Sequence, residues 1–267
     1  MPNLTRTLKA QELGALGTGN SSAATARKWM RASRFEFRWR LVIMLVIFAG
    51  CFAASAWQSN GHLGYLWILI TTWMSKLDRF TNETNSLILK VAVSALVVVS
   101  AALRTWAAAY LDSSVVQAGA VQTELVVAAG PYAYMRNPLY LGTILLALSL
   151  APMNGPGEGL ALVVLVVLFA MRLIRREELE LAAVQGREYL QYKSAVPALF
   201  PKLPNRAVII GAARPQWRQA FLGEIFPWVM AAGVIGYAVT FRAEWLGRAA
   251  LIGLGLSFVV RALRGLR

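Results

Sequence analysis

The sequence predicts an all-α, polytopic transmembrane protein with about six spans. Hydrophobic residues make up 57% of the 267 residues, and the mean hydropathy is +0.53, so the chain is more apolar than a typical soluble domain. The apolar residues lie in long continuous runs, which is typical of helices that face lipid. Basic residues lie beside these runs and give the chain a formal net charge of +14.

The excess of positive charge is distributed as in membrane proteins. The basic residues do not form one stripe with interleaved aromatic residues, so we expect no nucleic-acid partner. Their position beside apolar runs instead fits the positive-inside rule and contact with anionic lipid headgroups of the bilayer. We therefore expect a multi-pass membrane protein with both termini in the cytoplasm. Cys51 is the only cysteine and His62 the only histidine, which argues against a disulfide, a metal centre and histidine-based catalysis.

Residues 1–40 are predicted to form a mobile basic tail. The first 26 residues are rich in Ser, Thr, Gly, Ala and Asn and have no apolar periodicity. Six basic residues then precede the first apolar run: Arg27, Lys28, Arg31, Arg34, Arg38 and Arg40. Their spacing also allows an amphipathic helix on the headgroups. The apolar run at 41–57 is longer and lies further from the start than in a cleavable signal peptide, so we expect a retained first span.

Residues 41–112 are predicted to hold the N-terminal transmembrane helices, with spans at 41–57 and 87–111. The apolar run at 63–74 has about 12 residues, whereas a span needs roughly 20. We interpret it as an interfacial helix, because a crossing there would place the following loop on the side opposite the basic tail. Lys90 and Arg104 lie within the second span. Each either extends to the headgroups or has a role at an active site.

The predicted core at 113–201 contains two polar segments. The first, GPYAYMRNPLYLG at 130–142, is a loop that runs into an apolar helix. Asn137 and Pro138 predict the helix start, with asparagine as the cap and proline at the first position. A helix start has free amides and the positive end of the helix dipole, which suit a carboxylate or phosphate. The second segment, RREELELAAVQGREYLQYKSAVPALFP at 175–201, follows a helical hairpin predicted at 138–174.

The second helix of this hairpin is expected to continue as far as Tyr192. On such a helix, Glu178 lies on a partly apolar face, and Glu177 lies about 100° round the axis. The face is shared by Ile174, Leu181, Gln185 and Tyr192. A carboxylate on such a face needs a partner. The partner is either Arg136, Arg175 or Arg176 in an ordinary salt bridge, or a bound molecule.

In this order, the motifs GPYxxxRNPxYxG, EExxL and GxxYxxYxxxVPxxxP resemble the catalytic core of the isoprenylcysteine carboxyl methyltransferase and phospholipid methyltransferase superfamily. The resemblance covers roughly Val115 to Pro201. It implies an integral-membrane enzyme with a cofactor pocket for S-adenosylmethionine at the cytoplasmic face and a lipophilic methyl acceptor. The implied cofactor-binding residues are Tyr132, Asn137, Pro138, Tyr140, Gly142, Glu178, Tyr189 and Tyr192. The implied catalytic residues are Arg136, Glu177 and Glu178, with no metal.

Two positions depart from the superfamily pattern. The commoner RHP triplet is RNP here, so any role of that imidazole passes to the amide of Asn137 or is dispensable. Gln185 lies before Gly186, where an aromatic residue is usual. Both departures bear on the acceptor more than on the cofactor.

The sequence leaves the acceptor open. A core without histidine suits an acceptor that is already ionised, so we expect an isoprenylcysteine-like carboxylate or a related lipid or thiol. The first alternative is a phospholipid amine, for which a glutamate would take the proton. Further alternatives are a member that has lost turnover with the change to Asn137, and a non-enzymatic polytopic protein or transporter whose motifs only cap helices.

The C-terminal third is predicted to hold a basic connector at 202–224 and a transmembrane helix pair at 225–267. The connector carries Lys202, Arg206, Arg214 and Arg218. The pair consists of the apolar runs 226–241 and 246–260, which lie outside the recognised core. It either shapes the acceptor site, mediates oligomer formation or anchors the protein.

Overall fold

A computed structural model describes residues 31–58, 64–77, 80–118, 129–203 and 214–265. Within these ranges it contains helices and no strand, which confirms the predicted all-α class. The predictions for residues 1–26, for His62 and for the middle of the basic connector lie outside the described residues.

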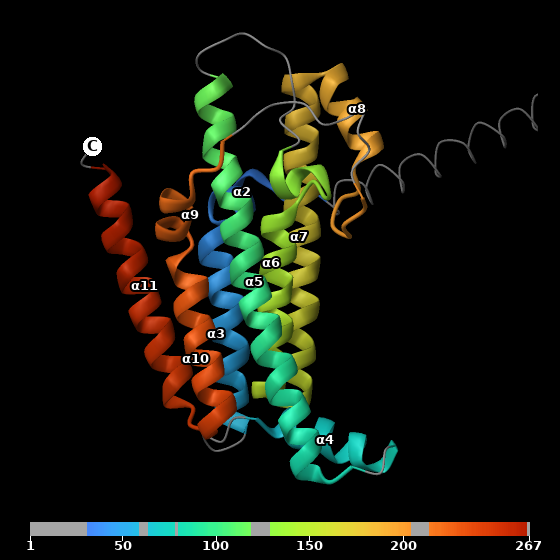
Figure 1. Cartoon of the computed structure of the whole chain (residues 1–267), viewed down its shortest axis with the longest axis vertical. Coiled ribbons are helices and arrows are strands. Elements are labelled where there is room, and N and C mark those ends of the chain that lie inside the picture. Colours follow the sequence, from blue (N-terminus) through green and yellow to red (C-terminus); the bar gives the residue numbers. More distant parts are fainter. Residues whose placement is uncertain (1–30, 59–63, 78–79, 119–128, 204–213, 266–267) are drawn as a thin grey trace, which may run out of the picture.

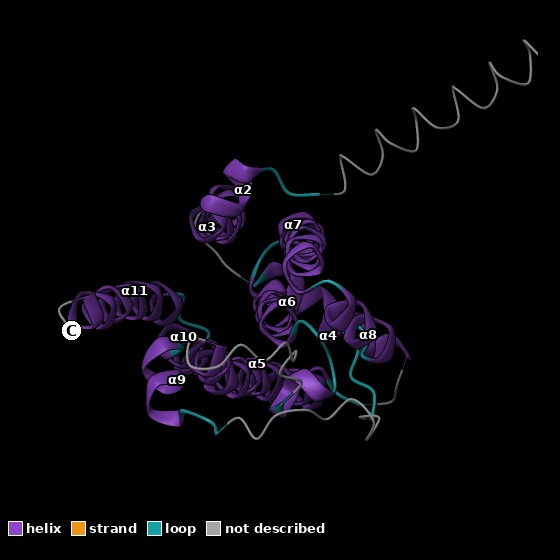
Figure 2. Cartoon of the chain, turned by 90° about the horizontal axis from the view of Figure 1, so that it is seen from above, coloured by secondary structure: helices purple, strands orange, loops and turns teal. Residues whose placement is uncertain are grey.

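In the part of the chain that the structure describes, six of the longer helices run roughly along one direction (Figure 1). They are α3 (Arg40–Gln58), α5 (Asn82–Ala118), α6 (Pro138–Leu150), α7 (Pro156–Gln185), α10 (Ile225–Thr240) and α11 (Glu244–Gly265). Seen from above, α6 lies between α5 and α7, and α10 lies between α5 and α11 (Figure 2). The shorter helices α2 (Arg34–Arg38), α8 (Arg187–Ala195) and α9 (Trp217–Gly223) lie towards one end, here called the upper end (Figure 1).

Each of the six predicted spans falls on one of these helices, and four or five of them qualify as spans by length and composition. Four are long and apolar enough to cross a membrane on their own, at Arg40–Gln58, Asn82–Leu111, Pro156–Gln185 and Glu244–Leu263. A fifth span results if α9 and α10 count as one span bent by 60°. The sixth segment, Pro138–Met153, is apolar but shorter. The protein is therefore an integral membrane protein, and which end faces the cytoplasm stays a prediction.

The run at 63–74 forms α4 (Tyr65–Leu77), which lies across the lower end of the bundle (Figure 1). Two backbone hydrogen bonds attach its start to the α6–α7 turn. Gly64 N donates to Met153 O at 2.8 Å, and Leu66 N donates to Asn154 O at 2.9 Å. This placement fits the predicted interfacial helix, because α3 descends and α5 returns to the upper end without a further crossing.

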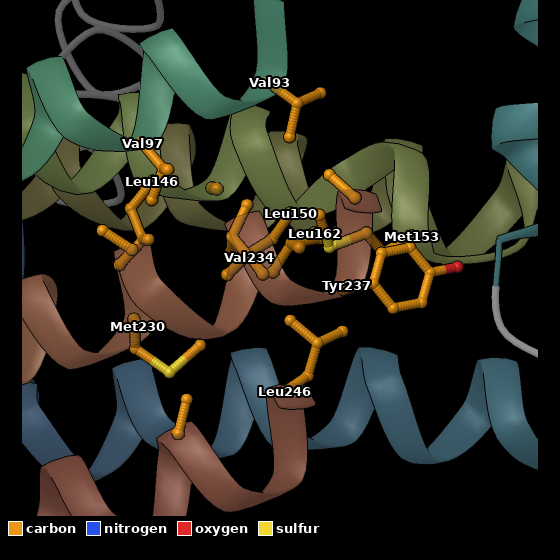
Figure 3. Close-up of a cluster of buried hydrophobic side chains, with 14 of the residues drawn as sticks. Val93, Val97, Leu146, Leu150, Met153, Leu162, Met230, Val234, Tyr237 and Leu246 are labelled. Carbon is orange, nitrogen blue, oxygen red and sulfur yellow. The ribbon is translucent and has the colours of Figure 1, made fainter. Parts of the chain in front are cut away.

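One apolar core joins the α6–α7 hairpin to α5 and to the C-terminal pair (Figure 3). Its labelled side chains come from five helices and the turn after α6: Val93, Val97, Leu146, Leu150, Met153, Leu162, Met230, Val234, Tyr237 and Leu246. In contrast, α3 and α11 expose large apolar side chains such as Val46, Leu251 and Phe258, as helices that face lipid do. The C-terminal pair is thus packed against the predicted core.

The predicted continuous helix to Tyr192 is wrong. α7 ends at Gln185, and α8 begins at Arg187. Between them, Gly186 has φ 59° and ψ −128°, a conformation that residues with a Cβ rarely adopt. Leu181 and Gln185 are accordingly exposed, whereas Tyr192 is buried through the new direction of α8.

Gly233 permits the close approach of α10 and α11. A Cβ here would collide with the Cβ of Ala249 and lie 2.9 Å from the carbonyl oxygen of Trp245. We expect Gly233→Ala to lower the free energy of unfolding by about 1–3 kcal/mol, since both neighbours belong to a packed helix. Chemical unfolding in detergent micelles measures this. The control is Gly247→Ala on α11, where a Cβ meets nothing within 4 Å and alanine favours the helix. Equal losses in both variants would contradict this packing.

Candidate active site

The two motif segments meet at the upper end of the bundle. The loop after η1 (Gly130–Ala133) runs beside residues 196–202, and backbone hydrogen bonds join them. Arg136 N donates to Pro197 O at 2.9 Å, and Asn137 N donates to Ala198 O at 3.1 Å. Lys202 N donates to Tyr134 O at 3.1 Å. Because each motif satisfies backbone groups of the other, the RNP triplet has one fixed position.

Arg136 connects three parts of the site. Its Nε and Nη2 lie 2.9 and 2.8 Å from Glu178 Oε1 on α7. Its Nη1 donates to the carbonyl of Lys193 at 2.7 Å and also to that of Val196. These contacts use most of the five N–H donors of the guanidinium. The geometry therefore gives Arg136 a positioning role, and its predicted catalytic role stays a prediction.

Glu178 is the most enclosed carboxylate of the site, with a side chain that is 9% exposed. Besides Arg136, Lys193 Nζ lies 2.9 Å from its Oε2. Arg136 was one of the three partners considered from the sequence, whereas Lys193 was not singled out. A signal was available, because Lys193 follows Tyr189 by four residues and so shares its face on α8.

Asn137 is the first residue before α6 and Pro138 its first helical residue, as predicted. The prediction that Asn137 caps α6 with its side chain is wrong, because this side chain makes no hydrogen bond to the first turn. Its Nδ2 instead donates to Ala198 O at 3.1 Å and lies 3.4 Å from Glu178 Oε1. The first-turn amides of α6 are thus left without this cap. Glu178, whose negative charge is opposite in sign to the N-terminal end of the helix dipole, lies beside Asn137.

Glu177 faces a different neighbour from Glu178. Tyr140 Oη, from α6, donates to Glu177 Oε1 at 2.9 Å. Arg40, at the start of α3, is among the charges that act on this carboxylate. The two carboxylates therefore lie on different sides of α7, in agreement with their predicted angular separation.

Tyr189 and Tyr192 attach α8 to the upper end. Both are buried, and their ring centroids lie 6.1 Å apart. The hydroxyl of Tyr192 donates to Tyr132 O at 2.7 Å, which brings η1 and α8 together. Burial, reinforced by the charge of Glu178, raises the pKa of Tyr189 to about 12. Burial also raises the pKa of Tyr192, so both hydroxyls stay protonated at neutral pH.

Gly142 lies apart from these residues, at the contact between α6 and α5. A Cβ here would collide with the side chain of Arg104 and lie 3.3 Å from Ser100 O. Ser100 Oγ donates to Gly142 O at 2.7 Å. The structure thus gives Gly142 a packing role, and its predicted contact with the cofactor stays a prediction.

The N-terminal segment, which the sequence did not connect with the site, packs against α7. Arg172 Nη2 donates to both carboxylate oxygens of Glu36, at 2.9 and 2.8 Å. Ala32 N donates to Arg172 O at 3.2 Å, and Arg176 Nη1 donates to Ala32 O at 3.2 Å. Partial burial alone would raise the pKa of Glu36, but hydrogen bonds from Arg172 and Ser33 lower it. The start of α3 is thereby held beside Glu177.

Part of the chain matches a known protein family. Residues 89–186 match the sequence model described as phospholipid methyltransferase. The match runs from α5 to the end of α7, so it contains the RNP triplet and both glutamates, and it stops before α8 and the C-terminal pair. No curated protein and no solved structure matches the chain.

Arg136 is expected to stabilise the fold much more than Lys193. Arg136→Gln removes the main charge partner of Glu178 and two carbonyl contacts, so we expect a loss of about 3–5 kcal/mol in the free energy of unfolding. Lys193→Gln should cost less than about 1 kcal/mol, because Lys193 is 39% exposed. Chemical unfolding in micelles compares the two. A loss with Arg136→Gln no larger than with Lys193→Gln would contradict this assignment.

Proposed function

We propose that this chain, whose residues 89–186 match the sequence model described as phospholipid methyltransferase, is a membrane methyltransferase that moves a methyl group from S-adenosylmethionine to a lipophilic acceptor. The observation that carries the proposal is the ion pair between Arg136 and Glu178. It joins two motifs 42 residues apart in the sequence at one end of the bundle. A transporter or a purely structural protein has no need for these two motifs at one membrane surface.

The polar groups at this end of the bundle fit the amino-acid part of S-adenosylmethionine, which carries both a carboxylate and an ammonium group. The first-turn amides of α6, which Asn137 leaves uncapped, suit the carboxylate. Glu178 suits the ammonium group, and Lys193 Nζ already places a cation 2.9 Å from its Oε2. Lys193 is the more exposed of the two cations at Glu178, so it is the one that a ligand displaces at least cost.

When bound, S-adenosylmethionine supplies a methyl group activated by the sulfonium charge. The chain's own residues then have to hold the reactants in line and exclude water, which contributes roughly 7–11 kcal/mol in well-oriented systems. Arg136 fixes the loop, while the buried side chains of Tyr189 and Tyr192 hold α8 over it. No proton has to move through these three residues.

The contact between Tyr140 and Glu177 supports an amine acceptor over the carboxylate expected from the sequence. Glu177 would repel a second carboxylate, whereas it attracts an ammonium group and is able to take its proton. Arg40 acts on the same carboxylate and is exposed, so the phosphate of a phospholipid would also meet an opposite charge. We therefore propose a phospholipid amine as the first acceptor, and an isoprenylcysteine-like carboxylate or thiol as the second.

We propose that the upper end faces the cytoplasm, where the methyl donor is made. The positions of α2 and of the last turns of α11 support this orientation, because both lie at the same end of the bundle as the site (Figure 1). The basic residues of α2 and of the α11 end fit the positive-inside rule.

Membranes that contain the protein, incubated with a methyl-labelled donor, are expected to yield label in lipid. Label in aminophospholipids would support the amine acceptor, and label in a prenylated peptide would support the carboxylate. Solute flux in proteoliposomes without consumption of the donor would contradict the enzymatic proposal. If the wild type is inactive and Asn137→His is active, the chain is a member that has lost turnover.

Donor binding is expected to depend on Glu178 and Arg136 more than on Lys193. Because both residues hold the RNP loop, Glu178→Ala and Arg136→Ala should each weaken the binding of S-adenosylhomocysteine at least tenfold by calorimetry. Lys193→Ala removes a competing cation from Glu178, so it should leave the affinity unchanged or raise it. A tenfold loss with Lys193→Ala, or no loss with the other two, would contradict the assigned donor site.

Glu177 is expected to act on the acceptor. Glu177→Gln removes the charge and the proton acceptor, so it should lower kcat for an amine acceptor about 100-fold while the affinity for S-adenosylhomocysteine changes little. Tyr140→Phe, which keeps the ring and removes only the hydrogen bond to Glu177, should have a smaller effect. An equal loss of donor affinity in Glu177→Gln would instead assign this glutamate to the donor.

A further inference from the structure

Arg104 of α5 makes an ion pair inside the bundle instead of extending to the headgroups. Its Nε donates to Glu224 Oε2 at 2.7 Å, and the two side chains are only 23% and 12% exposed. Ionisable residues within a span are uncommon, and where they occur they pair with one another and mark functional regions. The site described above uses neither residue, so this pair needs its own explanation.

A second nitrogen of the Arg104 guanidinium contacts the start of α6. Nη1 donates to Leu139 O at 3.2 Å and to Thr143 Oγ1 at 2.7 Å. The arginine side chain passes against Gly142, where a Cβ would collide with it. The contacted turn directly follows Asn137 and contains Tyr140. One guanidinium therefore connects Glu224 to the turn that carries two residues of the site.

Glu224 belongs to the C-terminal helices. It occupies the break between α9 and α10, which are bent by 60°, and its side chain does not cap α10. Contacts on either side fix this break on α5. Gln216 N donates to Ala109 O at 2.8 Å, and Trp228 Nε1 donates to Thr105 Oγ1 at 2.9 Å. The carboxylate is thus held in place independently of Arg104.

We propose that Glu224 and Arg104 are positioning residues, through which the C-terminal helices set the position of the start of α6. Glu224 balances the charge of Arg104 and orients its guanidinium. Arg104 then holds the Leu139 carbonyl and Thr143, and so keeps Asn137 against Glu178 and Tyr140 against Glu177. The inference rests on the proposed function for its effect on turnover, but the link between α10 and α6 is testable without it.

The decisive variants separate the ion pair from the contact with α6. Glu224→Gln removes the balancing charge. The double variant Arg104→Glu/Glu224→Arg restores an ion pair between α5 and the α9–α10 break, but a glutamate has no N–H group to donate to Leu139 O. The control is Glu244→Gln, which removes the Glu244–Arg248 pair of α11, 3.1 Å apart and 67% and 71% exposed.

Three quantities are measured on the full-length protein in lipid nanodiscs: the unfolding temperature, amide hydrogen exchange of residues 141–143, and methyl transfer. Glu224→Gln is expected to speed exchange in this segment and to lower kcat at least tenfold. The double variant should recover the unfolding temperature but neither the slow exchange nor kcat. Glu244→Gln should match the wild type in all three.

Recovery of slow exchange and kcat by the double variant would overturn the proposal, because the pair would then act only on stability. Exchange in Glu224→Gln at the wild-type rate would overturn it as well. Should Glu224→Gln not fold, the double variant decides by the same criteria. A wild type without methyl transfer to any acceptor contradicts the proposed function, and the exchange data still decide whether α10 positions α6.

Discussion

The structure of the upper end depends on the charge balance of Glu178. This carboxylate is almost fully enclosed, and Arg136 and Lys193 balance its charge from the loop before α6 and from α8. Burial of an unpaired carboxylate would be costly, so the loop and α8 have to stay where their cations reach it. One side chain on α7 thereby determines how two motifs that are distant in the sequence come together. The same demand makes it a natural position for a ligand with a positive group.

Much of the fold follows from the sequence, because lipid imposes simple rules on helices. Apolar runs predicted the long helices, and the short run at 63–74 forms a helix across the lower end of the bundle, where the interfacial helix was expected. The end of α7 was not predicted, because the three- and four-residue spacing from Ile174 to Tyr192 suits one continuous helix, whereas the break depends on the backbone angles of Gly186. Local patterns predicted Asn137 as a cap, but its Nδ2 donates to the carbonyl of Ala198, 61 residues away, and its side chain makes no hydrogen bond to the first turn.

The partners of the charged residues were least predictable. The motifs identified Arg136, Glu177 and Glu178. The ion pair of Lys193 with Glu178, and that of Arg172 with Glu36, became visible only in the three-dimensional structure. Arg104 illustrates the reason. Its position near the end of a span fitted a side chain that extends to the headgroups, yet an acidic residue 120 positions later offers a partner inside the bundle. Sequence spacing on one helix cannot contain such a contact.

Gly186 sets the direction of α8 by its backbone alone, with φ 59°. A straight continuation of α7 would carry Tyr192 and Lys193 away from the loop, so Gly186 determines how α8 lies over the site. Exchange of α8 between related chains would consequently have to retain the glycine at the junction. A graft joined one residue later, with another amino acid at the break, would present the same helix in a different direction.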